Sequence, residues 1–468
     1  MELNTLPMRP PGPALETSPD KPSRDDTLDL YSLVPYREDY RSRAVARRCF
    51  KTGESDCQVT WTDVDAQGQV NVRILSSLAE LRGYRSLHCP QRNAVRVFSI
   101  SQSNSWSRLN ATLDMFQEVV DSVGASPDLL ELPLFFYQKP NAVEEGYSGA
   151  PVLRLNADST EIIYIMKYAF EKPLEEKGKE NWVLRQTGVY QKYDMATGNS
   201  TFVFLHSRPE CQFQNRLLRF LQSPDYHTYL PRNPLLIHSI LFGTFLHVWR
   251  DYLKTLEDRM LPIANTTVAA ELDKPLRVNH ESLTAVRSTE NRCLALQPIF
   301  RSLDKTFEVL HQANAALSDC GRTQQAEVQA MKQLLNNYSS TVNSYSQAAW
   351  SLQSRISRIA AHITDTLSFK DAHTAKRQTD FMLRDSTTVR VITVVTLIYL
   401  PSTFMATLLG MNSFFEMDDN RRIVVSPQFW IYIVCSVPLT AATLLYWWYF
   451  QKAKQRGERS ANGDILTV

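Results

Sequence analysis

The sequence predicts an α/β cytosolic domain, followed by a long α-helical stalk and two C-terminal transmembrane helices. Three observations lead to this fold class. Strand-like alternation of apolar and polar residues is confined to the first part of the chain, and a stretch almost free of proline and glycine follows it. Two nearly uncharged apolar segments of about 20 residues, the length that crosses a bilayer, then stand near the end.

Composition limits the class of protein. Apolar residues make up 43% of the 468 residues, which is ordinary for a globular protein and excludes a polytopic transporter made mostly of membrane helices. The 51 basic and 49 acidic residues nearly cancel, leaving a net charge of +2. No basic stripe with interleaved aromatic residues stands out, so we expect no nucleic-acid partner.

The seven cysteines are scattered, and none belongs to a C-x-x-C pair. This spacing argues against a disulfide framework and against a structural zinc site. It favours idle thiols in a reducing compartment, with the soluble part facing the cytosol. The motifs of zinc proteases, dinucleotide enzymes, P-loop proteins and α/β-hydrolases are also missing, so we predict no enzymatic activity and no cofactor.

Residues 1–30 mix prolines with charges and are predicted to be a disordered tail. Residues 31–275 are predicted to form the α/β domain. Its strand candidates are Val70–Ile74, Ala94–Phe98, Glu161–Met166 and Thr201–Leu205. Its helix candidates are Arg108–Val120 and Pro234–Leu256. The second is too short and, with its two histidines, too polar to span a bilayer, so we predict a buried core helix.

Residues 276–388 are predicted to form the helical stalk. Between Leu283 and Arg390 the only proline is Pro298 and the only glycine is Gly321. The second half carries a heptad seam, which consists of Val328, Met331, Leu335, Tyr338, Val342, Tyr345, Ala349, Leu352, Ile356, Ile359 and Ile363. Such a seam predicts packing against another helix. Two partners stay open: other copies of the chain, along at least part of the seam, or the preceding helical stretch of the same chain.

Residues 389–410 and 429–450 are predicted to be the transmembrane helices, since each covers about 30 Å as a helix. Basic residues gather before the first segment and in the tail, residues 451–468. The connecting loop, residues 411–428, holds only two arginines beside three carboxylates. By the positive-inside rule we expect the loop to be extracytosolic and both termini to lie in the cytosol.

The end of the first span carries a longer pattern. Residues Tyr399 to Asn412 read YLPSTFMATLLGMN. Placed before the second of two C-terminal spans, P-S-T-F followed by G-M-N resembles the signature of the CorA family of divalent metal-ion transporters. The stretch Trp182 to Tyr193 is similar to the divergent, fungal-type CorA-like proteins. The resemblance implies a homopentameric channel that conducts hydrated Mg2+ or a related divalent cation down its electrochemical gradient. It also makes Mg2+ a candidate regulatory ion and the plasma membrane the expected location.

The resemblance also implies an outer selectivity mouth made of Gly410, Met411 and Asn412. The side-chain carbonyl of Asn412 and the backbone carbonyl of Gly410 would contact the ion through its hydration shell, because Mg2+ gives up its water reluctantly. Neutral acceptors also avoid binding the ion so tightly that it cannot leave. The alternative for Asn412 is an ordinary helix cap.

One face of the first span is implied to line the pore. Its residues recur at steps of three and four and are Val389, Ile392, Thr396, Leu400, Thr403 and Thr407. The threonines would give polar rings, and the aliphatic side chains would form a constriction that gates by dewetting. The alternative is that each threonine merely donates a hydrogen bond to the carbonyl four residues before it.

Charged residues flank the predicted pore on both sides. Glu416, Asp418 and Asp419 would concentrate cations at the mouth. The sequence departs here from the usual G-M-N-F-E of the family, so solvated loop charges are the open alternative. On the cytosolic side, a basic collar around the pore is implied by the resemblance and consists of Lys370, Lys376, Arg377 and Arg384. The alternative for the collar is that it only sets the membrane topology.

Two other functions stay open. The first is transport of Zn2+, Co2+ or Ni2+, since branches of the family differ, although Met411 favours Mg2+. The second is a membrane-anchored scaffold or sensor that retains the CorA-like tail without transport.

Overall fold

The structure, a computed structural model of the chain, describes residues 34–65, 68–87, 95–140, 146–173, 181–223, 230, 233–268, 278–321, 323–409, 415–417, 423–425, 427 and 429–463. They fall into two compact units. The sheet unit comprises Met1–Ala270 and Arg277–Ile363, and the span unit comprises Glu271–Leu276 and Thr364–Val468. The predicted tail, residues 1–30, lies outside the described residues.

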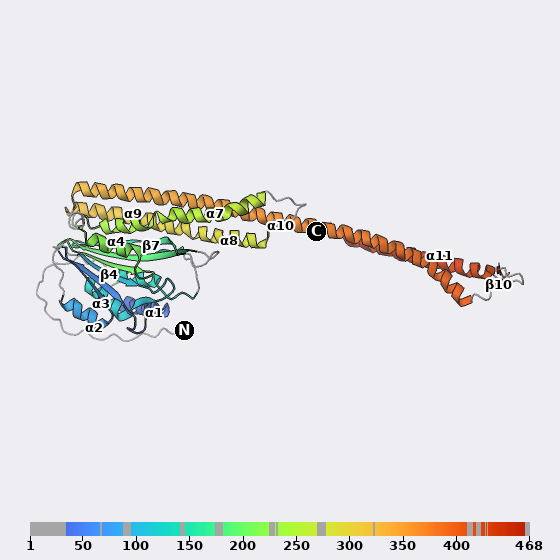
Figure 1. Cartoon of the computed structure of the whole chain (residues 1–468), viewed down its shortest axis with the longest axis horizontal. Coiled ribbons are helices and arrows are strands. Elements are labelled where there is room, and N and C mark those ends of the chain that lie inside the picture. Colours follow the sequence, from blue (N-terminus) through green and yellow to red (C-terminus); the bar gives the residue numbers. More distant parts are fainter. Residues whose placement is uncertain are drawn as a thin grey trace, which may run out of the picture. The chain divides into compact units, whose positions relative to one another are not determined.

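A seven-stranded mixed sheet forms the centre of the sheet unit (Figure 1), in the order β3-β2-β4-β9-β8-β7-β6. Its strands are β2 Val59–Val64, β3 Val70–Leu75, β4 Val95–Ser101, β6 Val152–Leu155, β7 Ser159–Glu171, β8 Trp182–Asp194 and β9 Ser200–His206. The pair β4 and β9 is parallel, with Ser101 opposite His206. The other strand pairs of this sheet, as far as the structure describes it, are antiparallel. Strands β4 and β9 therefore end at the same edge.

All four predicted strands are confirmed as β3, β4, β7 and β9. Strand β7 is buried along almost its whole length, because helices cover both faces of the sheet (Figure 1). That double cover explains why its sequence is a continuous apolar run rather than an alternating one. The adjoining β8 is equally long and pairs with β7 over all of its residues, so these two long strands form the largest pairing of the sheet, between β9 and the edge strand β6.

The helices on one face of the sheet are α1 Val34–Ala46, α2 Leu78–Leu87, α3 Leu113–Val123 and the 3-10 helix η2 Pro127–Phe135. They bury a core that includes Trp61, Phe98 and Phe116, each with no exposed surface. Beside them the short strand β1 Phe50–Lys51 pairs in parallel with β5 Leu109–Thr112.

Strand β5 corrects the predicted helix Arg108–Val120. The helix begins only after Thr112, whose hydroxyl oxygen accepts a hydrogen bond from the N–H of Met115 at 3.2 Å. A threonine that caps a helix in this way is itself in extended conformation, so the residues before it can join a strand. Gly124 ends the same helix with a left-handed backbone, φ 57°.

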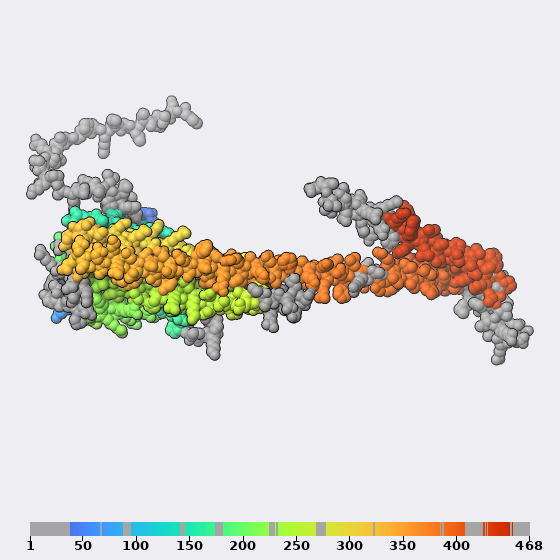
Figure 2. Space-filling view, turned by 90° about the horizontal axis from the view of Figure 1, so that it is seen from above, coloured from blue at the N-terminus to red at the C-terminus, as the bar shows by residue number. Residues whose placement is uncertain are grey.

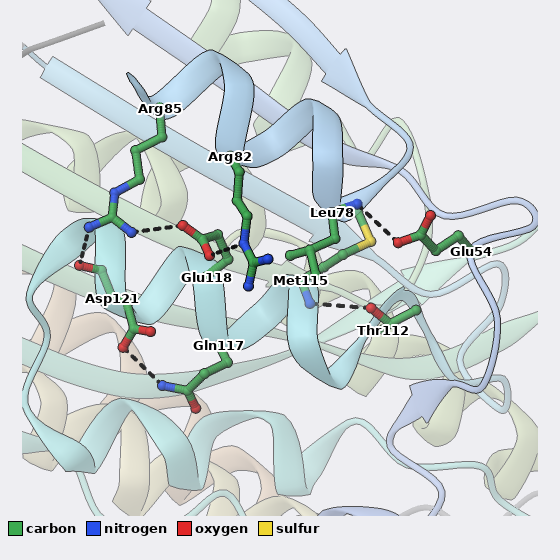
Figure 3. A network of polar contacts seen from close by, with 9 residues as sticks. All are labelled: Glu54, Leu78, Arg82, Arg85, Thr112, Met115, Gln117, Glu118 and Asp121. Atoms are coloured by element: carbon green, nitrogen blue, oxygen red, sulfur yellow. Dashed lines mark hydrogen bonds and ion pairs between the residues drawn. The ribbon is translucent and has the colours of Figure 1, made fainter. Parts of the chain in front are cut away.

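A network of polar contacts fastens α2 to α3 (Figure 3). Glu118 accepts hydrogen bonds from Arg82 at 2.9 Å and from Arg85 at 2.7 Å. Arg85 also donates to the main-chain oxygen of Asp121 at 3.3 Å. Burial alone would raise the pKa of Glu118, but the two guanidinium groups hold it below its ordinary value. The network therefore joins two helices that are separated in the sequence by strands β4 and β5.

A second network joins the sheet to the helices on its other face. His238 lies in α6 Leu236–Phe245 and is fully buried beside Tyr164 of β7 and Gln191 of β8. The Tyr164 hydroxyl lies 2.7 Å from Nδ1 of His238, and Nε2 lies 2.6 Å from the Gln191 side-chain oxygen. The Gln191 amide donates to the main-chain oxygen of Pro234 at 2.9 Å. The neutral ring therefore fits with Nε2–H as donor and Nδ1 as acceptor.

The predicted helix Pro234–Leu256 is two helices, since α6 stops at Phe245 and α7 Val248–Val268 begins after it. Its predicted burial is confirmed for α6, most of whose residues are buried. The same face of the sheet is also covered by α4 Gln212–Leu221, and α8 His280–Leu294 and α9 Leu296–Asp319 follow (Figure 1).

One long helix, α10 Gln325–Leu409, contributes to both units. Within the sheet unit its heptad seam is buried against helices of the same chain. Tyr338 packs on Phe307 of α9 with ring centroids 6.1 Å apart, and Ser339 donates to Asp304 of α9 at 2.6 Å. Glu257 of α7 pairs with α10 at 2.7 Å. Up to Ile363 the seam therefore packs within the chain, as one of the two interpretations predicted. One position differs, because Ala360 is buried and the predicted seam residue Ile359 is only half-buried.

The span unit contains the rest of α10, the hairpin of β10 Phe415–Met417 and β11 Ile423–Val425, and α11 Phe429–Gly463. Helices α10 and α11 each contain an apolar segment long enough to cross a membrane. Only 6% of each segment is buried within the chain. Figure 2 shows α11, in red, beside the C-terminal part of α10. Apolar helices with so little protein cover indicate that the chain is a membrane protein.

Candidate ion pathway

Helix α10 ends at Leu409, immediately before the predicted mouth. Gly410, Met411 and Asn412 lie outside the described residues, as do Asp418 and Asp419. Glu416 is described only in its backbone, in β10, where it pairs with Val424 of β11. The selectivity mouth and the acidic loop therefore stay predictions, and the structure describes the helix that leads to them.

The predicted pore face is uncovered along its whole length. The exposed fractions of its aliphatic side chains are 56% for Val389, 61% for Ile392 and 61% for Leu400. Its threonines, Thr396, Thr403 and Thr407, are exposed as well. Nothing in the described part of the chain packs over these six residues, so they are available to line a space between copies of the helix.

Helix α11 contacts a different face of α10. The Tyr432 hydroxyl donates a hydrogen bond to the main-chain oxygen of Ser402 at 3.2 Å, and the neighbouring Pro401 is buried. Nearer the cytosolic end predicted from the charges, a groove of about 440 Å³ separates the helices. It is lined by Thr393, Leu397, Ala442, Thr443, Tyr446 and Trp447. The chain thus pairs its two spans through one side of α10 and leaves the predicted pore side open.

Pro401 also interrupts the hydrogen-bond ladder of α10. Proline has no N–H, so the carbonyl of Leu397 lacks its usual helical donor. The helix nevertheless continues to Leu409. The interruption lies on the side that faces α11, where Tyr432 supplies a donor to the next turn of the helix.

Each threonine of the predicted pore face donates its hydroxyl hydrogen to the helix. The acceptors are the main-chain oxygens of Ile392 for Thr396 (2.9 Å), Tyr399 for Thr403 (3.0 Å) and Thr403 for Thr407 (2.8 Å). These bonds are the ones expected under the alternative interpretation, in which each threonine hydroxyl bonds to its own helix. It does not conflict with a pore role. A hydroxyl whose hydrogen is engaged by the helix can offer only its oxygen lone pairs to a neighbour.

The residues of the predicted cytosolic basic collar are described in part. Lys376 and Arg377 are exposed on α10, Lys370 is half-buried, and the side chain of Arg384 lies outside the description. The same stretch of helix exposes large apolar side chains, which are Phe369 (65%), Phe381 (73%), Met382 (71%) and Leu383 (62%). Basic and apolar residues thus share a segment that the chain itself leaves largely uncovered.

One pair in the sheet unit has the residue types of a nucleophilic site. The Cys211 sulfur lies 3.5 Å from Nδ1 of His206, and both residues are buried. Burial raises the pKa of Cys211 to about 11 and lowers that of His206 to about 3. A reactive cysteine needs a depressed thiol pKa, so this pair has the opposite electrostatics. Among the described residues, no group of three or more His, Cys, Asp or Glu side chains is placed to hold a metal ion.

The structure assembles a basic pocket at one end of the sheet that no local sequence pattern indicated. Its cationic residues are Lys139, Lys172, Arg185 and Arg208, and they come from four separate segments of the chain. No local spacing connects them, so no motif search could have found the pocket.

Two family models match the chain. The model described as "CorA-like Mg2+ transporter protein" matches residues 206–452, and the model described as "CorA-like transporters" matches residues 26–268. No curated protein matches. Among 27 matching chains of solved structures is the full-length CmaX protein, with 14% identity, 86% of this chain and 100% of that chain covered, and a TM-score of 0.39. The ZntB cytoplasmic domain from Vibrio parahaemolyticus RIMD 2210633 has 10% identity, coverage of 64% and 97%, and a TM-score of 0.35.

Proposed function

Because this chain belongs to the CorA-like Mg2+ transporter family, we propose that it is a channel for hydrated divalent cations, Mg2+ foremost, formed by several copies of the chain. The observation that carries the proposal is the uncovered, threonine-bearing face of α10, which leads directly to Gly410, Met411 and Asn412. In this proposal the face lines the pore, and the Asn412 side chain and the Gly410 carbonyl contact the ion's hydration shell at the outer mouth.

The threonine geometry supports passage of a hydrated ion. Water molecules bound to Mg2+ turn their hydrogens outward, and Mg2+ usually keeps several of these waters. A pore for such an ion should therefore present hydrogen-bond acceptors. The hydroxyl groups of Thr396, Thr403 and Thr407 donate their hydrogens to main-chain oxygens of the helix. Each hydroxyl oxygen would therefore act as a hydrogen-bond acceptor in the pore. Neutral acceptors hold the ion weakly enough for it to leave.

The aliphatic residues of the same face supply the barrier. Val389, Ile392 and Leu400 would form apolar rings when several copies of α10 surround one axis. An apolar ring excludes water from a narrow pore and so blocks a hydrated ion without binding it. Mg2+ bound on the cytosolic side is the proposed signal that favours the closed state.

The charge distribution sets the proposed direction of transport. With both termini in the cytosol, a negative inside potential drives a divalent cation inward with about 4.6 kcal/mol per 100 mV. Glu416, Asp418 and Asp419 would raise the local cation concentration at the outer mouth. Lys370, Lys376, Arg377 and Arg384 would form the basic collar at the inner end. The plasma membrane is the proposed location.

Self-association completes the pore, and the resemblance implies a homopentamer. The exposed apolar side chains of α10 from Phe369 to Leu400 support contact with other copies or with lipid. From Val328 to Ile363 the heptad seam already packs against other helices of the same chain. Oligomeric contact would therefore begin along α10 beyond that residue.

The experiment is Mg2+ uptake in cells that lack their own Mg2+ transporters. The intact chain should restore uptake, and Asn412→Ala should abolish it. The matched control Asn420→Ala, in the same loop, should take up Mg2+ like the intact chain. Surface labelling must show equal amounts of all three proteins in the membrane. Uptake of Zn2+, Co2+ or Ni2+ without Mg2+ would favour the second transport function. No uptake of any of these ions by the intact, folded chain would favour the scaffold.

A further inference from the structure

A pocket of about 510 Å³ lies in the sheet unit where the parallel strands β4 and β9 both end. The loop after β4, the start of β8 and the residues after β9 form its walls. Small-molecule sites in proteins commonly have volumes of about 300–1,000 Å³. In open α/β sheets they tend to lie beyond the carboxyl ends of strands. Both the size and the position of this pocket therefore suit a small ligand.

The described lining is strongly cationic. Lys139, Lys172, Arg185 and Arg208 face a single carboxylate, that of Glu210. The whole chain has almost equal numbers of basic and acidic residues, so this excess is local. Four positive charges around one concavity create a positive potential that attracts an anion of matching size.

Arg185 is the most constrained of the four cations. Its guanidinium lies 3.6 Å from the centroid of the Phe170 ring, and its Nε is buried with no hydrogen-bond partner in the part of the chain that the structure describes. The guanidinium carbon of Arg208 lies 5.8 Å from the centroid of the same ring. Burial, with a further contribution from Arg208, lowers the pKa of Arg185 to about 10. Among the described residues no carboxylate pairs with this half-buried guanidinium, so it is suited to receive an anionic group.

An aromatic ring completes the pocket. Trp106 is 51% exposed and lines the same cavity. Its loop is held in place: the Trp106 N–H donates to the Asn104 side chain at 3.0 Å, and the Trp106 carbonyl accepts from the Lys139 N–H at 3.0 Å. Asn104 in turn donates its N–H to the Ser107 hydroxyl at 3.0 Å. An indole presented by an ordered loop can stack on a planar ring at little entropic cost.

We propose that this pocket binds a nucleoside phosphate, with its phosphate groups beside Arg185, Arg208 and Lys172 and its base stacked on Trp106. The combination selects this class, because the cations alone would suit any small anion, whereas the indole adds a surface for a planar ring. The inference does not depend on the proposed transport function, since every residue involved belongs to the sheet unit.

The test is isothermal titration calorimetry of the full chain in detergent, in a buffer with EDTA so that Mg2+ does not mask the phosphates. The ligands are ADP, AMP, inorganic phosphate and adenosine. ADP should bind most tightly, phosphate more weakly and adenosine most weakly. Arg208→Ala and Lys172→Ala should each weaken ADP binding about tenfold, the effect of losing one charge-assisted hydrogen bond. Trp106→Leu should weaken ADP binding and leave phosphate binding unchanged.

Two exposed cations outside the pocket serve as matched controls, Arg219→Ala for Arg208 and Lys305→Ala for Lys172, and both should bind ADP like the intact chain. The proposal is overturned if the intact chain does not bind ADP, or if the pocket variants and the controls bind it equally. Equal affinity for ADP and phosphate, unaffected by Trp106→Leu, would also overturn it and indicate a site for small anions only. Circular dichroism of each variant excludes misfolding as the cause of any loss.

Discussion

The hydroxyl of Tyr432 in α11 donates a hydrogen bond to the main-chain oxygen of Ser402 in α10, 3.2 Å away. Ser402 follows Pro401, the residue that interrupts the ladder of α10. The contact therefore joins the two spans one turn beyond the carbonyl of Leu397, which lacks its usual helical donor. It also fixes which side of α10 meets α11, and so which side stays open.

Replacing Tyr432→Phe should weaken the pairing of the two spans. An interhelical hydrogen bond within a membrane is worth about 0.6 kcal/mol, because the separated helices find other partners. The expected result is a lower free energy of unfolding by about that amount, measured by denaturation with SDS in mixed micelles. The control is Tyr449→Phe, whose ring is 70% exposed. A loss for Tyr449→Phe as large as that for Tyr432→Phe would contradict the prediction.

Replacing Thr403→Val should reduce Mg2+ uptake, because valine keeps the shape of the side chain and removes the acceptor oxygen. We expect a loss of about tenfold, corresponding to about 1.4 kcal/mol summed over the ring of subunits. Thr403→Ser should retain uptake. The measurement is the Mg2+ flux of the intact chain and of both variants, at equal amounts of protein in the membrane.

The matched control for that change is Thr440→Val in α11. Thr440 also donates to the carbonyl four residues before it, at 2.7 Å, but it lies outside the pore face. Its replacement should leave uptake intact. If both valine variants lose uptake equally, the effect comes from helix distortion and the pore face assignment is wrong.

The buried histidines should make the sheet unit sensitive to acid. Burial lowers the pKa values of His206 and His238 to about 3, from an ordinary value of 6.5. Between these values the unfolded chain binds protons that the folded chain does not, so stability rises with pH. Each histidine contributes a slope of up to about 1.4 kcal/mol per pH unit. The stability is fully present above pH 6.5 and is lost as the pH falls toward 3.

Urea unfolding of the full chain at several pH values, followed by the tryptophan signal, measures this slope. His238→Phe should lower the slope as well as the stability at neutral pH, since Tyr164 and Gln191 lose their partner. His247→Gln, at an exposed position, should leave the slope unchanged. An identical slope in the intact chain and in His238→Phe would show that His238 does not titrate in this way.

Replacing Glu118→Gln should loosen α2 from α3. Glu118 is 11% exposed and holds both Arg82 and Arg85 (Figure 3), so its loss removes two charge-assisted contacts at once. We expect a cost of about 1 kcal/mol in the free energy of unfolding. The comparison is Asp114→Asn, which breaks a solvent-exposed pair with Arg41 and should cost less than about 0.5 kcal/mol. Urea unfolding at neutral pH and low salt measures both, and equal costs would contradict the prediction.

The elements that depend on local pattern could be predicted from the sequence. The length and composition of single segments predict the two apolar spans. Short apolar or alternating runs predict the strands β3, β4, β7 and β9. The start of the helix after β5 was placed wrongly, because Thr112 divides a stretch whose apolar residues suit either a strand or a helix.

The tertiary structure decided which surfaces meet. The heptad seam was visible in the sequence, but its partner was not, since a stripe of apolar residues fits a neighbouring copy as well as a helix of the same chain. The structure shows that, up to Ile363, the seam packs against α9 and α7 of the same chain. In the same way, α11 selects the side of α10 that carries Ser402, and thereby leaves the threonine face open.

By itself, the sequence determined the class of this protein: a membrane protein with an N-terminal α/β domain, a long helix and two C-terminal apolar spans, the first followed by G-M-N. Those properties reside in continuous segments, where length, spacing and charge act locally. The structure alone brought Lys172, Arg185 and Trp106 to one pocket and His238 beside Tyr164. Such groups come together only when distant strands pair, because their proximity depends on the fold of the whole sheet.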